Sequence, residues 1–270
     1  MYTGLHPDHH ASSSHLQEPK NGFGESRVAV RTGPLTVSTL TLVRHGQAHP
    51  FQRESAALTS LGEAQASKLA QFWLRAGVRF DEVHCGTLPR QARTEQVVAQ
   101  CFRAAGEPWP AAVHDDAWNE YDAPGVMQHL VPGDGRLRAL AEAFEQARGS
   151  PDENRMFQRM FEAAMAGWLE GWFEADGVES WPAFRSRVWG AIQRVMAGPA
   201  RRQVAVFTSG GPIGLTVQSS LKAPARSFLD VNWRVRNTSI TQFVFDRSRL
   251  TLDSFNAIPH LEEVTLWTYR

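Results

Sequence analysis

Arg44, His45 and Gly46 follow a run of β-branched and apolar residues, and their types suit the handling of a phosphate group. A neutral imidazole can attack phosphorus and form a phosphohistidine, so His45 is the candidate nucleophile. Arg44 beside it offers a forked guanidinium that is always charged and can bind a phosphate dianion. We therefore predict that this triplet binds and attacks a phosphoryl group.

Two further side chains fit the same chemistry, because phosphoryl transfer needs positive donors around the equatorial oxygens and an acid for the leaving group. Arg90 follows a short strand pattern and opens a helical one, where backbone amides also favour anions, so it is the candidate second phosphate ligand. Glu120 lies in an aromatic loop, and burial there would raise its pKa toward the range of a general acid. A capping or ion-paired glutamate is the alternative interpretation of Glu120.

Strands and helices alternate along the chain and place these residues at one edge of a sheet. Strand patterns are predicted at 37–43, 82–85, 113–115, 203–208, 239–245 and 250–255. Helices are predicted at 60–77, after a capping box at Ser60–Glu63, and at 89–105 and 181–197. This order predicts an α/β fold with a mostly parallel central sheet and helices on both faces, a three-layer α/β/α arrangement with its chemistry at the carboxyl ends of the strands.

Two segments depart from this alternation. Residues 1–36 have no helical or alternating period and are predicted to be a disordered tail, whose irregularly spaced histidines do not form a metal motif. Residues from about 125 to 178 are helical in pattern and rich in Met, Phe and Trp, which predicts a helical cap inserted into a domain spanning 37–270. Most of its large apolar side chains are expected to pack in a core.

The composition excludes several classes of function. Lys and Arg together number 28, as do Asp and Glu, so the net charge near zero gives no electrostatic case for nucleic acid or a membrane surface as partner. No apolar stretch is long enough to span a membrane, and the N-terminus lacks the order of a signal peptide. Only two cysteines are present, which suits a reducing compartment, so a cytoplasmic location is expected.

Beyond these separate features, the chain from residue 39 onward resembles the histidine phosphatase superfamily, also called phosphoglycerate mutase-like. Four ordered segments carry the resemblance: 42–48 (LVRHGQA), 58–66 (LTSLGEAQA), 85–94 (CGTLPRQART) and 119–122 (NEYD). The closing segments 237–241 and 256–261 are also similar to the last strands of that family.

The resemblance implies a phosphate pocket made by Arg44, His45 and Arg90, with His45 becoming phosphorylated. It implies that Glu120 protonates the departing alkoxide and then activates water, with no metal or other cofactor. The expected function is therefore metal-independent hydrolysis of a small phosphorylated substrate, a phosphomonoester.

One departure from the family pattern concerns the turn Ser209-Gly210-Gly211. The family places a second histidine where Ser209 stands, and losing one preorganised donor typically costs about 3–4 kcal/mol, or roughly a hundred- to thousand-fold in rate. Weakened activity is expected, with the Ser209 hydroxyl and the amides of Gly210 and Gly211 serving as the remaining phosphate donors. His49 and His84 are alternative sources of the missing imidazole.

The same residues are less consistent with several other functions. A cysteine-dependent phosphatase site at Cys85 is disfavoured because its spacing to Arg90 is one residue too short, and a serine-hydrolase pair of Ser209 with His260 is disfavoured because Phe207 occupies the glycine position of the elbow. The main alternative is a phospho-ligand binding or regulatory protein that has lost turnover. Retention of both a nucleophile and an acid argues against it, and a mutase is less favoured than either the phosphatase or this binding protein.

Overall fold

The central sheet contains six strands in the part of the chain that the computed structural model describes, which is residues 37–49, 57–133, 135–172 and 177–269. The strands are β1 (Ser38–Arg44), β2 (Glu82–Cys85), β3 (Val113–His114), β4 (Gln203–Thr208), β5 (Ile240–Phe245) and β6 (Leu250–Ala257). Their order is β3-β2-β4-β1-β5-β6, with the first four parallel and β5 antiparallel to both of its neighbours. The predicted α/β fold with a mostly parallel sheet is confirmed.

The described residues belong to a compact unit spanning Gly33–Arg270. The predicted tail, residues 1–36, lies outside the described residues together with its four histidines. Among the helices described, none has the length and apolar character needed to cross a membrane.

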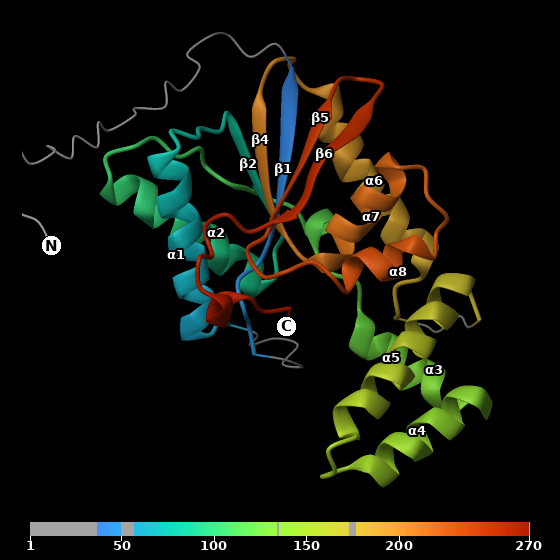
Figure 1. Cartoon of the computed structure of the whole chain (residues 1–270). Helices are drawn as coiled ribbons and strands as arrows, with labels where there is room; N and C mark the ends of the chain where they lie inside the picture. The colour runs from blue at the N-terminus through green and yellow to red at the C-terminus, as the bar shows by residue number, and fades with distance from the viewer. Residues whose placement is uncertain (1–36, 50–56, 134, 173–176, 270) are drawn as a thin grey trace, which may run out of the picture. The chain divides into compact units, whose positions relative to one another are not determined.

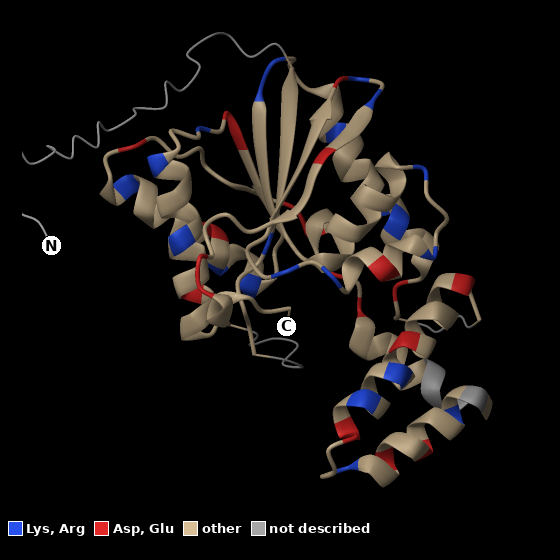
Figure 2. Ribbon diagram, in the orientation of Figure 1, with Lys and Arg blue, Asp and Glu red and all other residues tan. Residues whose placement is uncertain are grey.

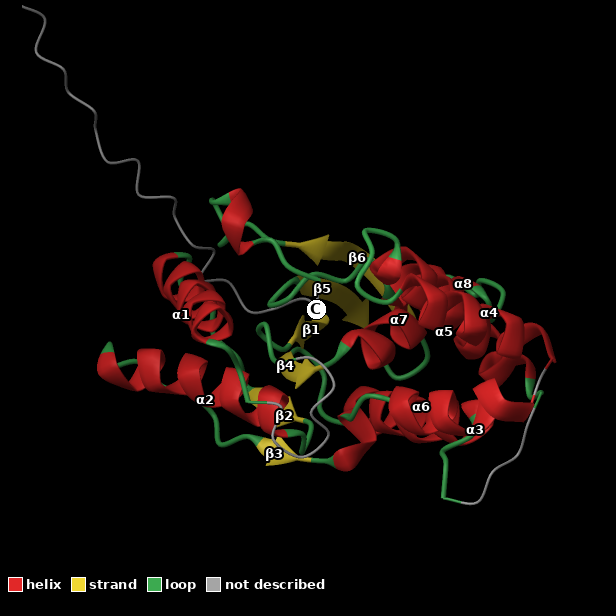
Figure 3. Ribbon diagram, turned by 90° about the horizontal axis from the view of Figure 1, so that it is seen from below, coloured by secondary structure: helices red, strands yellow, loops and turns green. Residues whose placement is uncertain are grey.

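Helices cover both faces of the sheet (Figures 1 and 3). One face carries α1 (Ser60–Arg75) and α2 (Pro89–Ala104), and the other carries α6 (Trp181–Ala197), α7 (Gly210–Ser220) and α8 (Ser227–Asn232). Each face has its own apolar core: Leu40 and Leu42 of β1 pack into the cluster formed with α6 and α7, whereas Val43 packs into the one formed with α1 and α2. The alternation of side chains along β1 therefore buries both faces of the strand.

The start of α1 corrects a detail of the sequence analysis. The capping side chain is Thr59 rather than Ser60, since Thr59 Oγ1 accepts the Gly62 amide at 3.1 Å. The Glu63 carboxylate does not return to this cap but pairs with Arg93 at 2.6 Å. The helix was predicted correctly, but the capping residue was displaced by one position because Thr59 and Ser60 are adjacent and both types can cap a helix.

A three-helix cap stands at the end of the sheet where β1, β2 and β4 terminate (Figure 1). It consists of α3 (Ala123–Gly133), α4 (Gly135–Ala147) and α5 (Glu153–Glu170). Trp168 of α5 joins it to the core by stacking on Tyr121 with ring centroids 4.9 Å apart and by donating its indole N–H to the Glu179 carbonyl at 2.7 Å. Met165 and Trp168 are buried as expected, whereas Phe157 and Phe161 line a cavity.

Candidate active site

Strand register brings the chemistry-bearing residues together. Arg44, the last residue of β1, lies opposite Thr208, the last residue of β4, and Cys85 at the end of β2 lies opposite Phe207. Three parallel strands therefore end at the same level, and the residues that follow them share one edge of the sheet.

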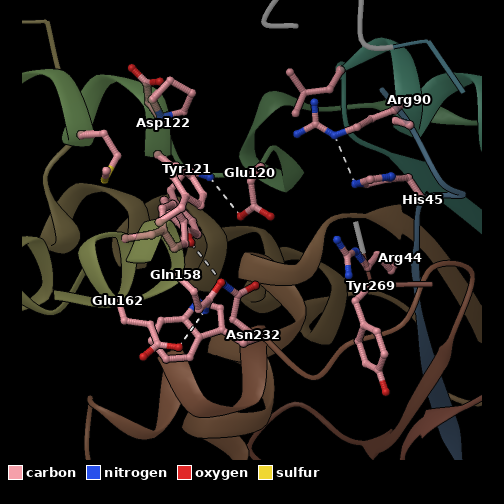
Figure 4. A pocket seen from close by; sticks show the side chains of 18 of the residues that line it. Arg44, His45, Arg90, Glu120, Tyr121, Asp122, Gln158, Glu162, Asn232 and Tyr269 are labelled. Atoms are coloured by element: carbon pink, nitrogen blue, oxygen red, sulfur yellow. Dashed lines mark hydrogen bonds between the residues drawn. The ribbon is translucent and has the colours of Figure 1, made fainter. Parts of the chain in front are cut away.

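His45 is buried, and its hydrogen bonds fix the tautomer of its ring. Nδ1 lies 2.7 Å from the carbonyl oxygen of Gly46, which can only accept, so Nδ1 carries the proton. Nε2 then has a free lone pair, and it accepts the Arg90 Nε–H at 3.1 Å (Figure 4). Burial, followed by the positive charges of Arg90 and Arg44, lowers the pKa of His45 well below its usual value. The ring is therefore held neutral and nucleophilic at Nε2.

The glycine of the triplet is required by a close approach. A β-carbon added at Gly46 would collide with the backbone of Gly62 at the start of α1. The Gly46 amide in turn donates to Thr94 Oγ1 at 3.0 Å, and that hydroxyl donates to the Arg90 carbonyl at 2.7 Å. These contacts tie the loop after β1 to the first turns of α2, which is why His45 and Arg90 meet.

Both predicted arginines line the cavity next to His45. Arg44 donates from Nη1 to the carbonyl of Val235, which fixes the position of its guanidinium. Arg90 lies in the first turn of α2, directly after Pro89. Burial lowers the pKa of Arg90 and the charge of Glu120 opposes that shift, so the guanidinium and the carboxyl group lie close enough to interact.

Glu120 faces His45 and Arg90 across the cavity (Figure 4). Both of its carboxylate oxygens accept the Gly211 amide at 3.1 Å, at the N-terminus of α7. Burial raises the pKa of Glu120, although the Gly211 hydrogen bond and the charges of Arg90 and Arg44 oppose the shift. The structure thus places a carboxyl group with a raised pKa opposite His45, the arrangement that general acid catalysis beside a nucleophilic histidine would need.

The loop that carries Glu120 is fixed from behind by three polar side chains. Gln91 Nε2 and Thr208 Oγ1 both donate to the Trp118 carbonyl, at 3.1 and 2.6 Å. Arg187 of α6 donates to the carbonyls of Asp116, Ala117, Asn119 and Glu120. Arg187 is itself held by two bonds to Glu179, at 2.5 and 2.8 Å. No local pattern marks Arg187 in the sequence, because its partners lie about seventy residues away along the chain.

The turn after β4 is arranged differently from the expectation. Ser209 is fully buried and absent from the cavity lining, and its Oγ accepts from Gln91 Nε2 at 2.8 Å. The Gly211 amide is already used by Glu120. The turn thus holds Gln91 and Glu120 in place. Direct phosphate binding by Ser209, Gly210 and Gly211 stays a prediction.

Asn232, at the end of α8, is a cavity residue that the sequence analysis did not single out. Its Oδ1 lies 2.5 Å from the position that a β-carbon on Gly210 would take, so the amide occupies the space left by the glycine. Nδ2 donates to the Tyr121 hydroxyl at 3.1 Å. An amide from another element therefore lies beside the turn formed by Ser209, Gly210 and Gly211.

Of the remaining candidate residues His49, His84, Cys85 and His260, only His49 lines the cavity. His49 lines the cavity from an exposed position, whereas His84 bonds Glu82 at 2.5 Å outside the lining. Cys85 is completely buried and its pKa is raised by burial, so it is held as an unreactive thiol. His260 bonds Thr238 at 2.9 Å. Ser209 is thus hydrogen-bonded to Gln91, and His260 is hydrogen-bonded to Thr238, so the two do not form the pair that a serine hydrolase needs.

The cavity has a volume of about 880 Å³ and extends from His45 to the cap. Its cap wall comes from the start of α3 and one face of α5, and its core wall includes Trp233, Arg234 and Tyr269. This volume is at the upper end of the range for small-molecule sites, roughly 300–1,000 Å³. The space beyond His45 and the two arginines can therefore admit a sizeable small molecule.

This chain is similar to known proteins both in its sequence pattern and in its fold. The sequence model of the histidine phosphatase superfamily (branch 1) matches residues 40–155 and 136–258, which together contain all the cavity residues named above except Tyr269. No curated protein matches the chain at a significant level.

Solved structures of similar fold include three enzymes by description. The phosphoglycerate mutase from Bacillus anthracis str. Sterne is 16% identical, with a TM-score of 0.57, covering 84% of this chain and 96% of its own. The α-ribazole phosphatase from Shigella flexneri is 20% identical, with a TM-score of 0.53 and coverages of 81% and 96%. The phosphoserine phosphatase from Entamoeba histolytica, in complex with 3-phosphoglyceric acid, is 20% identical, with a TM-score of 0.54 and coverages of 83% and 99%. At these identities the likeness concerns the fold.

Proposed function

This chain belongs to the histidine phosphatase superfamily (branch 1), and from that membership and the site geometry we propose that it hydrolyses a small phosphomonoester through a phosphohistidine at His45. The observation that carries the proposal is the fixed tautomer of His45. Its Nδ1 proton is committed to the Gly46 carbonyl, so the Nε2 lone pair faces the cavity beside Arg90.

The first chemical step transfers the phosphoryl group to the enzyme. Nε2 of His45 attacks phosphorus while the bond between phosphorus and the leaving oxygen breaks, and Glu120 gives its proton to that oxygen. Arg44 and Arg90 bind the equatorial oxygens, where the phosphate displaces the resting bond from Arg90 to His45. The product alcohol then leaves the cavity.

The second step returns the enzyme to its starting state. Water attacks phosphorus, the bond to Nε2 breaks, and the Glu120 carboxylate accepts a proton from the water. His45 is again neutral and Glu120 again protonated, so protons balance over the cycle.

Asn232 supplies the remaining donor in this proposal. Its amide lines the cavity next to Gly210, and rotation of the amide plane would let the Tyr121 hydroxyl donate to Oδ1 while Nδ2 donates to a phosphate oxygen. Ser209 and Gly211 act indirectly, by holding Gln91 and Glu120. Gly210 leaves room for the Asn232 side chain.

A phospho-ligand binding protein without turnover is the second candidate, and one observation favours it: Ser209, which stands where the family resemblance implies a second histidine, is bonded to Gln91 and does not line the cavity. Three solved neighbours are described as a phosphatase bound to a small phosphorylated acid, another phosphatase and a mutase. These descriptions support a small phosphorylated substrate for this chain. They include both phosphatases and a mutase, so an experiment must distinguish hydrolysis of the substrate from transfer of its phosphate.

The test is rapid-quench labelling with a ³²P-phosphomonoester. Wild-type protein is expected to form an acid-labile phosphoenzyme and release inorganic phosphate, and His45→Ala is expected to do neither. His114→Ala is the matched control, because this exposed histidine lies outside the cavity lining. Binding without labelling or turnover would favour the second candidate, and return of the label to an alcohol rather than to water would indicate a mutase.

A further inference from the structure

The two walls of the cavity carry opposite charges. The core wall holds Arg44 and Arg90 at the phosphate end, and Arg234 at an exposed position. The cap wall holds Asp122 and Glu162. Arginines are present on the cap (Figure 2), yet none among its described side chains lines the cavity. A ligand that reaches from Arg44 and Arg90 to Glu162 therefore meets positive charge at one end and negative charge at the other.

The two carboxylates of the cap wall have different roles. Asp122 accepts the Gly125 amide at 3.0 Å and so caps the start of α3. Glu162 is half-buried on α5 and receives a hydrogen bond from the neutral Gln158 amide at 2.7 Å. Within the described ranges no basic side chain forms an ion pair with Glu162. A half-buried carboxylate is costly without a cation, and the open cavity is where one can enter.

Aromatic rings surround the same part of the cavity. Phe157 and Phe161 are four residues apart on α5, as are Gln158 and Glu162, so one face of the helix presents both pairs to the cavity. Trp233 lines the opposite wall. Aromatic faces beside a carboxylate form a typical site for a protonated or quaternary amine, through cation–π attraction and ion pairing.

Figure 4 shows Glu162 and Gln158 on the far side of Glu120 from His45 and Arg90. The negative, aromatic end is thus separated from the phosphate end by the residue that protonates the leaving oxygen in the proposed reaction. A leaving group attached through that oxygen would extend toward Glu162.

We propose that the substrate is the phosphomonoester of a cationic amino alcohol, with its ammonium group bound by Glu162 and the rings of Phe157, Phe161 and Trp233. This inference rests on the proposed function for the position of the phosphate. It adds the charge and the chemical class of the leaving group.

The test compares phosphocholine with 3,3-dimethylbutyl phosphate, which has the same shape with carbon in place of the charged nitrogen. Turnover by wild-type protein gives the ratio of kcat/KM for the pair. Calorimetry on His45→Ala gives the ratio of Kd values without any reaction. We expect a preference of about tenfold for phosphocholine in both measurements. Glu162→Gln should reduce the ratio to about twofold or less, because only the charge is removed.

Glu142→Gln is the matched control, since this glutamate is exposed on α4 of the same cap and lies outside the cavity lining. It should leave the ratio unchanged. Equal binding of the two ligands, or a preference that survives Glu162→Gln, would overturn the inference. Failure of wild-type protein to hydrolyse p-nitrophenyl phosphate would instead overturn the proposed function, and the calorimetric ratio would still decide whether the cation site exists.

Discussion

Replacing Glu120 by Gln tests the assignment of acid catalysis most directly. The amide keeps the shape of the side chain, and its oxygen can still accept the Gly211 amide that now lies 3.1 Å from both carboxylate oxygens. What it removes is the proton that burial retains by raising the pKa of Glu120. The variant therefore separates proton donation from packing.

The expected loss depends on the leaving group. An alkoxide leaves poorly unless it is protonated, and general acid catalysis is worth about 10²- to 10⁴-fold, or roughly 2.7–5.5 kcal/mol of barrier. For n-butyl phosphate we expect kcat/KM to fall by that factor. A nitrophenolate is stable as an anion, so for p-nitrophenyl phosphate the loss should be about tenfold or less.

The assay is phosphate release from both substrates by wild type, Glu120→Gln and the exposed control Glu142→Gln, with circular dichroism melts to compare folding. A large difference between the two substrates in Glu120→Gln alone supports the acid role. An equal loss for both would refute the reasoning. It would mean that Glu120 acts through its charge on Arg90 and Arg44, which the structure also brings near it.

Three further outcomes follow from the contacts. Asn232→Ala should lower kcat/KM by about 10²-fold through loss of a phosphate donor, whereas Asp230→Ala, exposed on the same helix, should have no effect; equal values for both would remove Asn232 from the site. In a pH profile with n-butyl phosphate, activity should rise with pH through the lowered pKa of His45, because the imidazole must be neutral to attack. Activity should fall again through the raised pKa of Glu120, because the carboxyl group must be protonated. A wild-type profile that keeps rising toward alkaline pH would contradict this order. Arg187→Met should lower the free energy of unfolding in urea by about 2–3 kcal/mol, because four backbone carbonyls lose their charged donor; a change within about 0.5 kcal/mol would show that these bonds are replaced by water.

The elements that position the site were predictable because their signals are local. The predicted strand at 203–208 matches β4 at both ends, and the predicted helix at 181–197 matches α6. An apolar run or a helical period involves only residues that are close together in the sequence, so it can be recognised without knowing the rest of the chain. The family resemblance rested on the same kind of local segments.

Contacts between distant segments were not predictable in this way. Ser209 was expected to be a phosphate donor from its place after a strand, and the structure adds a partner that the sequence could not show, Gln91, which lies 118 positions earlier. Asn232 ends a six-residue helix that has too few turns to show a period. Its place in the cavity depends on Tyr121 and on the absence of a side chain at Gly210. Such roles become visible only once the fold has brought the elements together.

Burial shifts the pKa values of both His45 and Glu120, and these shifts determine the net charge of the site. Burial disfavours the charged form of each, so it lowers the pKa of His45 and raises the pKa of Glu120. Both groups are therefore driven toward the neutral form that begins the proposed reaction. The charge left at the phosphate end is then that of Arg44 and Arg90, which matches a phosphate dianion. Were Glu120 ionised in the resting state, it would cancel half of that charge and repel the incoming phosphate, so in the proposed reaction its raised pKa would serve substrate binding as well as proton donation.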